Sequence, residues 1–101
     1  MHLTLAVDVE IVAKAALKQL GISGTSLETD DSVCGLVGLL CHAVFPLSIE
    51  HPNGTILIKN SETCIGIKIT NSALTAVITV HGRSSADVTE KTKRLQEFFG
   101  L

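Results

Sequence analysis

The stretch TCIGIKITNSALTAVITVHG, from Thr63 to Gly82, decides the fold of this 101-residue chain. Its first half places an isoleucine at every second position, which is the period expected for a strand with one buried face. Its second half alternates in the same way from Leu74 onward, and the polar triplet Thr70-Asn71-Ser72 between the halves predicts a turn. The stretch therefore predicts two antiparallel strands joined by a short connection.

Two more runs with a period of two precede this stretch. Residues 47–51 (LSIEH) and 55–60 (TILIKN) flank Pro52-Asn53-Gly54, which is typical of a type I turn closed by a left-handed glycine. Asn60-Ser61-Glu62 predicts the turn that follows. We therefore expect a four-stranded antiparallel meander, which residues 2–7 (HLTLAV) can join as an N-terminal strand because they alternate too.

Two amphipathic helices are predicted near the ends of the chain. The first, residues 9–20, follows Asp8 as its N-cap and ends at Gly21, where a left-handed glycine is expected. The expected apolar stripe of this helix consists of Val9, Val12, Ala13, Ala16, Leu17 and Leu20. The C-terminal helix begins with Ser84 and Asp87 at the spacing of a capping box.

The helix predicted between them, residues 33–45 (VCGLVGLLCHAVF), is apolar nearly all round. It ends before Pro46, and an acidic or hydroxyl residue among residues 30–32 is expected to cap its start. Close packing of this helix explains Gly35 and Gly38. A helix with this pattern needs either a deep central position in its own domain or the surface of a partner.

Together these segments predict a single α+β domain over residues 1–101, with helices packed on an antiparallel sheet in two layers. The expected order of elements is β-α-α-β-β-β-β-α. Residues 21–31 read as a loop with a short extended piece at residues 25–28.

The composition narrows the classes of function. A formal net charge of −2, three Phe and no Trp or Tyr argue against a nucleic-acid partner, because neither phosphate attraction nor base stacking is supplied. An odd count of three cysteines favours reduced thiols and a cytoplasmic location. The longest apolar stretch, residues 32–49, is interrupted by glycines, His42 and Pro46, so no membrane span is expected.

The turn after residue 80 is the best candidate for a ligand site. Amides at the start of the C-terminal helix favour an anion, and His81, Arg83, Ser84 and Ser85 could add contacts to phosphate or carboxylate. Capping by Ser84 and Asp87 explains the same residues without a ligand, and the Asp87 carboxylate would repel an anion. We expect the cap, and keep a small-molecule or anion-binding protein or enzyme as the alternative function.

Other catalytic arrangements find little support. Ser85 and Asp87 do not face each other on a helix, which argues against a hydrolase triad with His81. The same geometry separates the neighbours Cys41 and His42. No local pair of metal ligands has the spacing of a zinc site, so neither a metal nor another cofactor is expected, although folding could still bring scattered ligands together.

We therefore expect a non-catalytic interaction or assembly subunit, an adaptor-like small domain. Its partner is expected to be another protein or a second copy, with a homodimer as the favoured form. The expected contact surfaces are the edges of the sheet and the apolar face of the middle helix. The helix residues chosen for that interface are Val33, Leu36, Val37 and Leu40.

Overall fold

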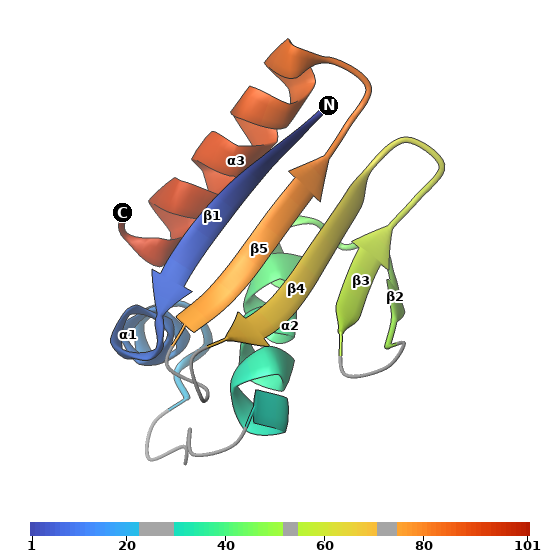
Figure 1. The fold of residues 1–101 in the computed structure, drawn as a ribbon. Helices are drawn as coiled ribbons and strands as arrows, with labels where there is room; N and C mark the ends of the chain where they lie inside the picture. The colour runs from blue at the N-terminus through green and yellow to red at the C-terminus, as the bar shows by residue number, and fades with distance from the viewer. Residues whose placement is uncertain (23–29, 52–54, 71–74) are drawn as a thin grey trace.

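The computed structural model describes residues 1–22, 30–51, 55–70 and 75–101, excepting the side chains of residues 30–32 and 69–70. It contains three helices and five strands, and it confirms the predicted α+β class and order of elements (Figure 1). The elements are β1 (His2–Asp8), α1 (Val9–Leu20), α2 (Asp30–Val44), β2 (Ser48–Glu50), β3 (Ile56–Lys59), β4 (Cys64–Thr70), β5 (Thr75–His81) and α3 (Ser85–Phe99).

All five strands form one antiparallel sheet with the order β1-β5-β4-β3-β2. The predicted meander is its continuous part, and the N-terminal strand β1 joins it beside the last strand, β5. The two pair without a break from His2 opposite His81 to Asp8 opposite Thr75. The edges of the sheet are therefore β1 and β2, one at each end of the strand order.

The helices cover one face of the sheet, and the core lies between that face and the helices. Alternate residues of four strands point into this core. They are Leu5, Val7, Ile56, Ile58, Ile65, Ile67, Ala76, Ile78 and Val80, all of them at most 8 % exposed. Helix α2 packs against β3, β4 and β5, and α3 packs against β1 and β5. In Figure 1, α2 lies behind the strands, so the viewer faces the side of the sheet that no helix crosses. We call that side the outer face.

Helix α2 occupies the centre of the helical layer, where it also contacts α1 and α3. A Cβ atom at Gly38 would lie 2.9 Å from Ile56 Cδ1, so the predicted close packing is confirmed there. It is wrong for Gly35, which is exposed and has no atom within 4 Å of such a position.

The buried stripe of α1 differs from the predicted one. Val12, Ala15 and Ala16 are buried, whereas Leu17 is 58 % exposed and Leu20 is 37 % exposed. Ala13 is exposed as well. The reason is tertiary, because α1 packs through small side chains mainly against α2 and α3 and contacts the sheet chiefly at β1.

The caps follow the predicted residues with one difference. Asp8 occupies the N-cap position of α1, but its side chain makes no capping hydrogen bond. Gly21 and Gly100 close α1 and α3 in the left-handed conformation, with φ of 67° and 78°. Each glycine amide donates back to a carbonyl of the preceding turn, which satisfies groups that the helix end leaves open.

One of the three predicted turns can be assessed. Asn60 Oδ1 accepts hydrogen bonds from the amides of Glu62 and Thr63, both at 2.8 Å, and this turn is confirmed. The turns predicted at 52–54 and 70–72, the extended piece at 25–28 and the capping side chains among residues 30–32 lie outside the described residues, apart from the backbone of residue 70.

Candidate functional site

The junction between β5 and α3 forms the predicted helix cap. Ser84 is the extended N-cap residue, and its Oγ accepts a hydrogen bond from the Asp87 amide at 3.2 Å. Asp87 Oδ2 in turn accepts from the Arg83 amide at 3.3 Å. The carboxylate thus reaches one residue beyond the N-cap, and the two side chains occupy two of the amides that an anion would have used.

Asp87 also carries a fixed negative charge at this junction. Its other oxygen, Oδ1, accepts from Lys91 Nζ one turn further along α3. This hydrogen bond from Lys91, opposed by partial burial and assisted by the Arg83 amide, lowers the pKa of Asp87 below its ordinary value. An incoming phosphate or carboxylate would therefore meet an ionised carboxylate that already has two partners.

Gly82 is required by space and not by a left-handed conformation. Among the described glycines only Gly21 and Gly100 have a positive φ, so Gly82 does not use the left-handed conformation that glycine allows. A Cβ atom at Gly82 would lie 2.5 Å from Asp87 Oδ2 and 2.9 Å from Val88 Cγ2. The glycine therefore allows the chain to pass directly over the carboxylate that caps the helix.

The other residues predicted for an anion site are directed elsewhere. The Arg83 guanidinium is paired with Glu62, with Nη1 and Oε1 3.3 Å apart, and the two side chains are 69 % and 53 % exposed. Such a pair stabilises the fold little. Ser85 lies within the first turn of α3, and its carbonyl accepts from the Thr89 hydroxyl at 2.7 Å.

His81 faces away from this junction. It follows the buried Val80 on β5, so its side chain lies on the outer face, whereas α3 packs on the opposite face. Its ring is 5.3 Å from that of His2 between centroids, with 35° between the planes. Arg83, Ser84 and Ser85 stay neighbours at the start of α3, with Arg83 paired to Glu62, whereas His81 is separated from them. This separation also removes the geometry of a triad with Ser85.

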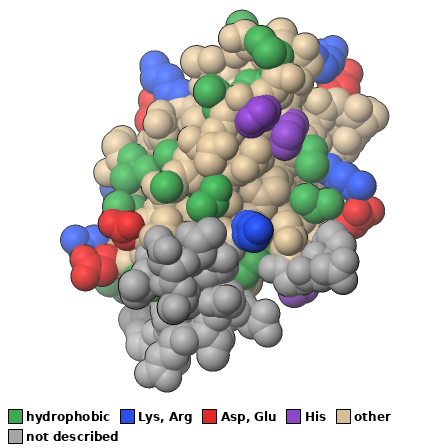
Figure 2. Space-filling view, viewed as in Figure 1, with side chains coloured by type: hydrophobic (Ala, Val, Ile, Leu, Met, Phe, Trp, Pro, Cys, Tyr) green, Lys and Arg blue, Asp and Glu red, His purple; other side chains and the backbone are tan. Residues whose placement is uncertain are grey.

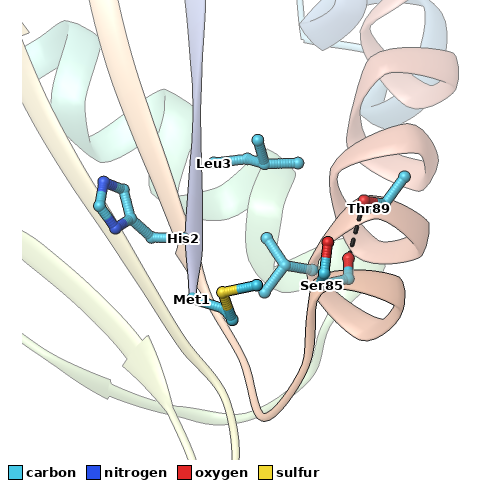
Figure 3. Close-up of a pocket in the computed structure, with 6 residues that line it drawn as sticks. Met1, His2, Leu3, Ser85 and Thr89 are labelled. Atoms are coloured by element: carbon cyan, nitrogen blue, oxygen red, sulfur yellow. Dashed lines mark hydrogen bonds between the residues drawn. The ribbon is translucent and has the colours of Figure 1, made fainter.

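A small cavity lies near this junction, between the start of β1 and the first turns of α3 (Figure 3). Its volume is about 60 Å³, and Met1, Leu3, Ser85 and Thr89 contribute to its lining. In Figure 3 the ring of His2 points to the other side of β1 from Leu3. Sites for small organic ligands are several times larger, so this cavity suits a few water molecules at most.

The four helix residues predicted as an interface lie in the core. Their exposed fractions are 0 % for Val33, Val37 and Leu40 and 5 % for Leu36. Of the two positions considered for an apolar helix, α2 takes the deep central one, packed against its own sheet. Among the described side chains of α2, Leu39 is 55 % exposed, and Ala43 is exposed as well.

The buried cysteines are unsuited to nucleophilic chemistry. Burial raises the pKa of the Cys41 thiol to about 12, so it stays protonated and His42 does not activate it. Cys34 is buried too, and its Sγ donates to the Ile67 carbonyl at 3.9 Å. Among the described residues, no group of three or more His, Cys, Asp or Glu side chains is arranged to hold a metal ion.

The outer face is the feature that the sequence reasoning missed. Figure 2 shows that charged side chains gather mainly around its rim, with one basic side chain near its centre and two histidines side by side. By strand alternation its residues on the three strands β1, β5 and β4 are His2, Thr4, Ala6, Asp8, Thr75, Val77, Thr79, His81, Cys64, Gly66 and Lys68. The alternation of the sequence could have identified this set once the strand order was known.

Among the described residues no strand pairs with β1 on its side away from β5, and the backbone groups along this free edge can be assigned. The Gly82 amide donates to the Met1 carbonyl at 3.3 Å, so residue 1 forms a hydrogen-bonded pair with residue 82. In an antiparallel ladder, hydrogen-bonded pairs alternate with pairs that are not hydrogen-bonded. Residues 3, 5 and 7 therefore also form backbone hydrogen bonds with β5. The amides and carbonyls of the even residues 2, 4, 6 and 8 therefore point outward, away from β5.

No family model, curated protein or solved structure matches this chain. No described helix has the length and apolar character needed to cross a membrane. Any assignment of function therefore rests on the geometry of the chain itself. The longer of the two sheet edges, β1, presents a regular row of outward main-chain groups.

Proposed function

We propose that the protein is a non-catalytic assembly subunit that pairs with a second copy of itself through the free edge of β1. The observation that carries the proposal is the edge itself. It is seven residues long, stays in unbroken register with β5, and contains no Lys, Arg or Pro. A long edge without such residues is a template for another strand.

The opposite edge of the sheet, β2, has features that oppose pairing with another strand. Strand β2 has three residues, and the Glu50 carboxylate on it forms an ion pair with Lys59 on β3 at 3.0 Å. Short length and charge are two of the means by which proteins prevent edge pairing. Strand β1 is seven residues long, and its acidic side chain, Asp8, lies at its last position, which favours β1 as the contact surface.

Helix α3 leaves the β1 edge accessible. Leu3 points toward the side of the sheet where α3 packs, yet it is 42 % exposed. If α3 closed over the edge, Leu3 would be covered. An approaching strand can therefore reach the outward groups of β1 without displacing α3.

The register of β1 supports pairing with an identical strand. A twofold axis at Leu5 places Thr4 opposite Ala6 of the second copy and His2 opposite its Asp8. All four are even-numbered residues, whose amides and carbonyls point outward, so they form the hydrogen-bonded pairs of a new ladder. The Asp8 carboxylate then stands beside the His2 imidazole, so the one acidic side chain of the strand gains a polar neighbour.

Hydrogen exchange of individual amides tests this proposal. At a protein concentration that favours association, the Thr4 and Ala6 amides should be protected, and dilution should remove that protection. The Leu5 amide bonds to β5 within one chain and should stay protected at both concentrations. Rapid exchange of Thr4 and Ala6 at every concentration would refute pairing through this edge.

A further inference from the structure

We propose that His2 and His81 form a two-imidazole clamp for a divalent transition-metal ion of the Zn²⁺ or Ni²⁺ type. The proposal goes beyond assembly through β1, because both ligands belong to one chain. It begins from the pairing of β1 with β5, which places the two histidines directly opposite each other. Both side chains are exposed on the outer face, so an ion can reach them from solvent.

The separation of the rings fits a shared metal ion. A zinc–nitrogen bond is about 2.0–2.1 Å, and an imidazole nitrogen lies about 1 Å from its ring centre, so two rings on one tetrahedral ion have centroids roughly 5 Å apart. The observed separation of the His2 and His81 centroids is 5.3 Å. The backbone pairing already brings the rings to this distance, so rotation of the two side chains is sufficient to turn a nitrogen of each ring toward a shared ion.

The chemistry of the ligands selects the ion. Imidazole nitrogen suits Zn²⁺, Cu²⁺ and Ni²⁺, whereas Mg²⁺ and Ca²⁺ require oxygen ligands. No third His, Cys, Asp or Glu completes the group among the described residues of one chain, so in a single chain water fills the remaining positions. This open, two-ligand arrangement implies weaker binding than that of a closed structural zinc site.

Cys64 provides a control for metal binding, because it lies level with His2 and His81 across the sheet. It lies opposite His81 on β4, on the flank away from His2. An ion held between the two imidazole rings is therefore on the far side of His81 from the Cys64 thiol. His51, an exposed histidine beyond the end of β2, provides a second control for unspecific binding to a single imidazole.

The decisive experiment is titration of the untagged protein with Zn²⁺ and separately with Ni²⁺ by isothermal calorimetry. One ion should bind per chain, and Mg²⁺ should not bind at the same concentrations. His2→Asn and His81→Asn should each weaken binding by at least about tenfold, because even the loss of a residue behind a ligand typically costs that much. Cys64→Ser and His51→Asn should leave the affinity unchanged.

A second readout distinguishes the clamp from loose adsorption. An ion that joins β1 to β5 binds the folded chain more tightly than the unfolded one, so saturating Zn²⁺ should raise the melting temperature of the wild type. The rise should disappear in both single variants, whose folding is checked by circular dichroism without metal. Equal Zn²⁺ affinity in the wild type and His81→Asn, or equal weakening by His51→Asn, would overturn the proposal.

Discussion

The backbone amide of Arg83 donates to the carboxylate of Asp87 at 3.3 Å, across the turn that leads from β5 into α3. Asp87 also pairs with Lys91 on the same helix. One carboxylate thereby fixes both the exit of a central strand and the first turns of a helix that covers the core. The junction is held together by the ionised Asp87 carboxylate. Its stability should therefore depend on the protonation of Asp87 and on substitutions next to that carboxylate.

The stability of the protein should depend on the charge of Asp87 in the acid range. Its pKa in the folded chain is depressed, chiefly by the hydrogen bond from Lys91, so its contribution is present above the ordinary carboxyl pKa of about 3.9. That contribution is lost as the pH falls through the lower pKa of the folded state. Asp87→Asn should therefore lower the urea midpoint at neutral pH, and the difference from the wild type should shrink below about pH 4.

Glu90→Gln is the matched control for this pH series, because Glu90 is an exposed acidic residue on the same helix. Its urea midpoints should follow those of the wild type throughout. A gap between Asp87→Asn and the wild type that stays constant down to pH 2 would show that the charge of Asp87 is not responsible.

Substitution of Gly82 should be costly even by alanine. The new Cβ would lie 2.5 Å from Asp87 Oδ2, which is held by the Arg83 amide. We expect Gly82→Ala to lower the free energy of unfolding by about 1–3 kcal/mol, the usual cost of forcing an extra carbon into a filled space. In an Asp87→Ala background the loss should be smaller, and chemical denaturation of the four proteins of this cycle measures the coupling.

The two glycines of α2 should respond to alanine in opposite directions. Gly35 is exposed with open space around it, so Gly35→Ala should stabilise the helix by about 0.5–1 kcal/mol. At Gly38 the same carbon would lie 2.9 Å from Ile56 Cδ1, and the isoleucine would have to move. Gly38→Ala should therefore lose stability in the same denaturation assay, and equal gains at both positions would contradict the packing of α2 on β3.

The three cysteines should differ in reactivity toward a thiol reagent. Cys64 is half-buried on the outer face, whereas Cys34 and Cys41 lie in the core, where burial raises the pKa of Cys41 to about 12. In the folded protein one thiol should react at neutral pH, and Cys64→Ser should abolish that reaction. All three thiols should react in denaturant, and prompt labelling of Cys41 in the folded chain would show that the core opens.

Local pattern was sufficient to predict most elements from the sequence. Period-two alternation identified the strands, and the Ser84 and Asp87 spacing identified the cap that the structure confirms. Tertiary packing decided the rest. The exposure of Leu17 on α1 follows from how that helix meets its neighbours, and the need for Gly82 follows from a carboxylate five residues later that folds back over it.

The histidine pair and the β1 edge both depend on pairing between distant parts of the chain. Neither His2 nor His81 has a metal-binding partner nearby in the sequence, and they meet only because β1 joins the sheet beside β5. The same pairing turns β1 into an edge. Predicting that the N-terminal strand belongs to the sheet was possible, whereas its place in the strand order required the three-dimensional structure.

Sedimentation equilibrium of three proteins tests pairing through β1 most directly. The Ala6 amide points outward, so Ala6→Pro removes a donor from the edge without removing a hydrogen bond to β5, while Ala6→Val keeps the donor. The wild type and Ala6→Val should sediment as dimers, and Ala6→Pro as a monomer with an unchanged circular dichroism spectrum. A wild type that stays monomeric at every concentration, or an Ala6→Pro variant that dimerises as well as Ala6→Val, would contradict the account.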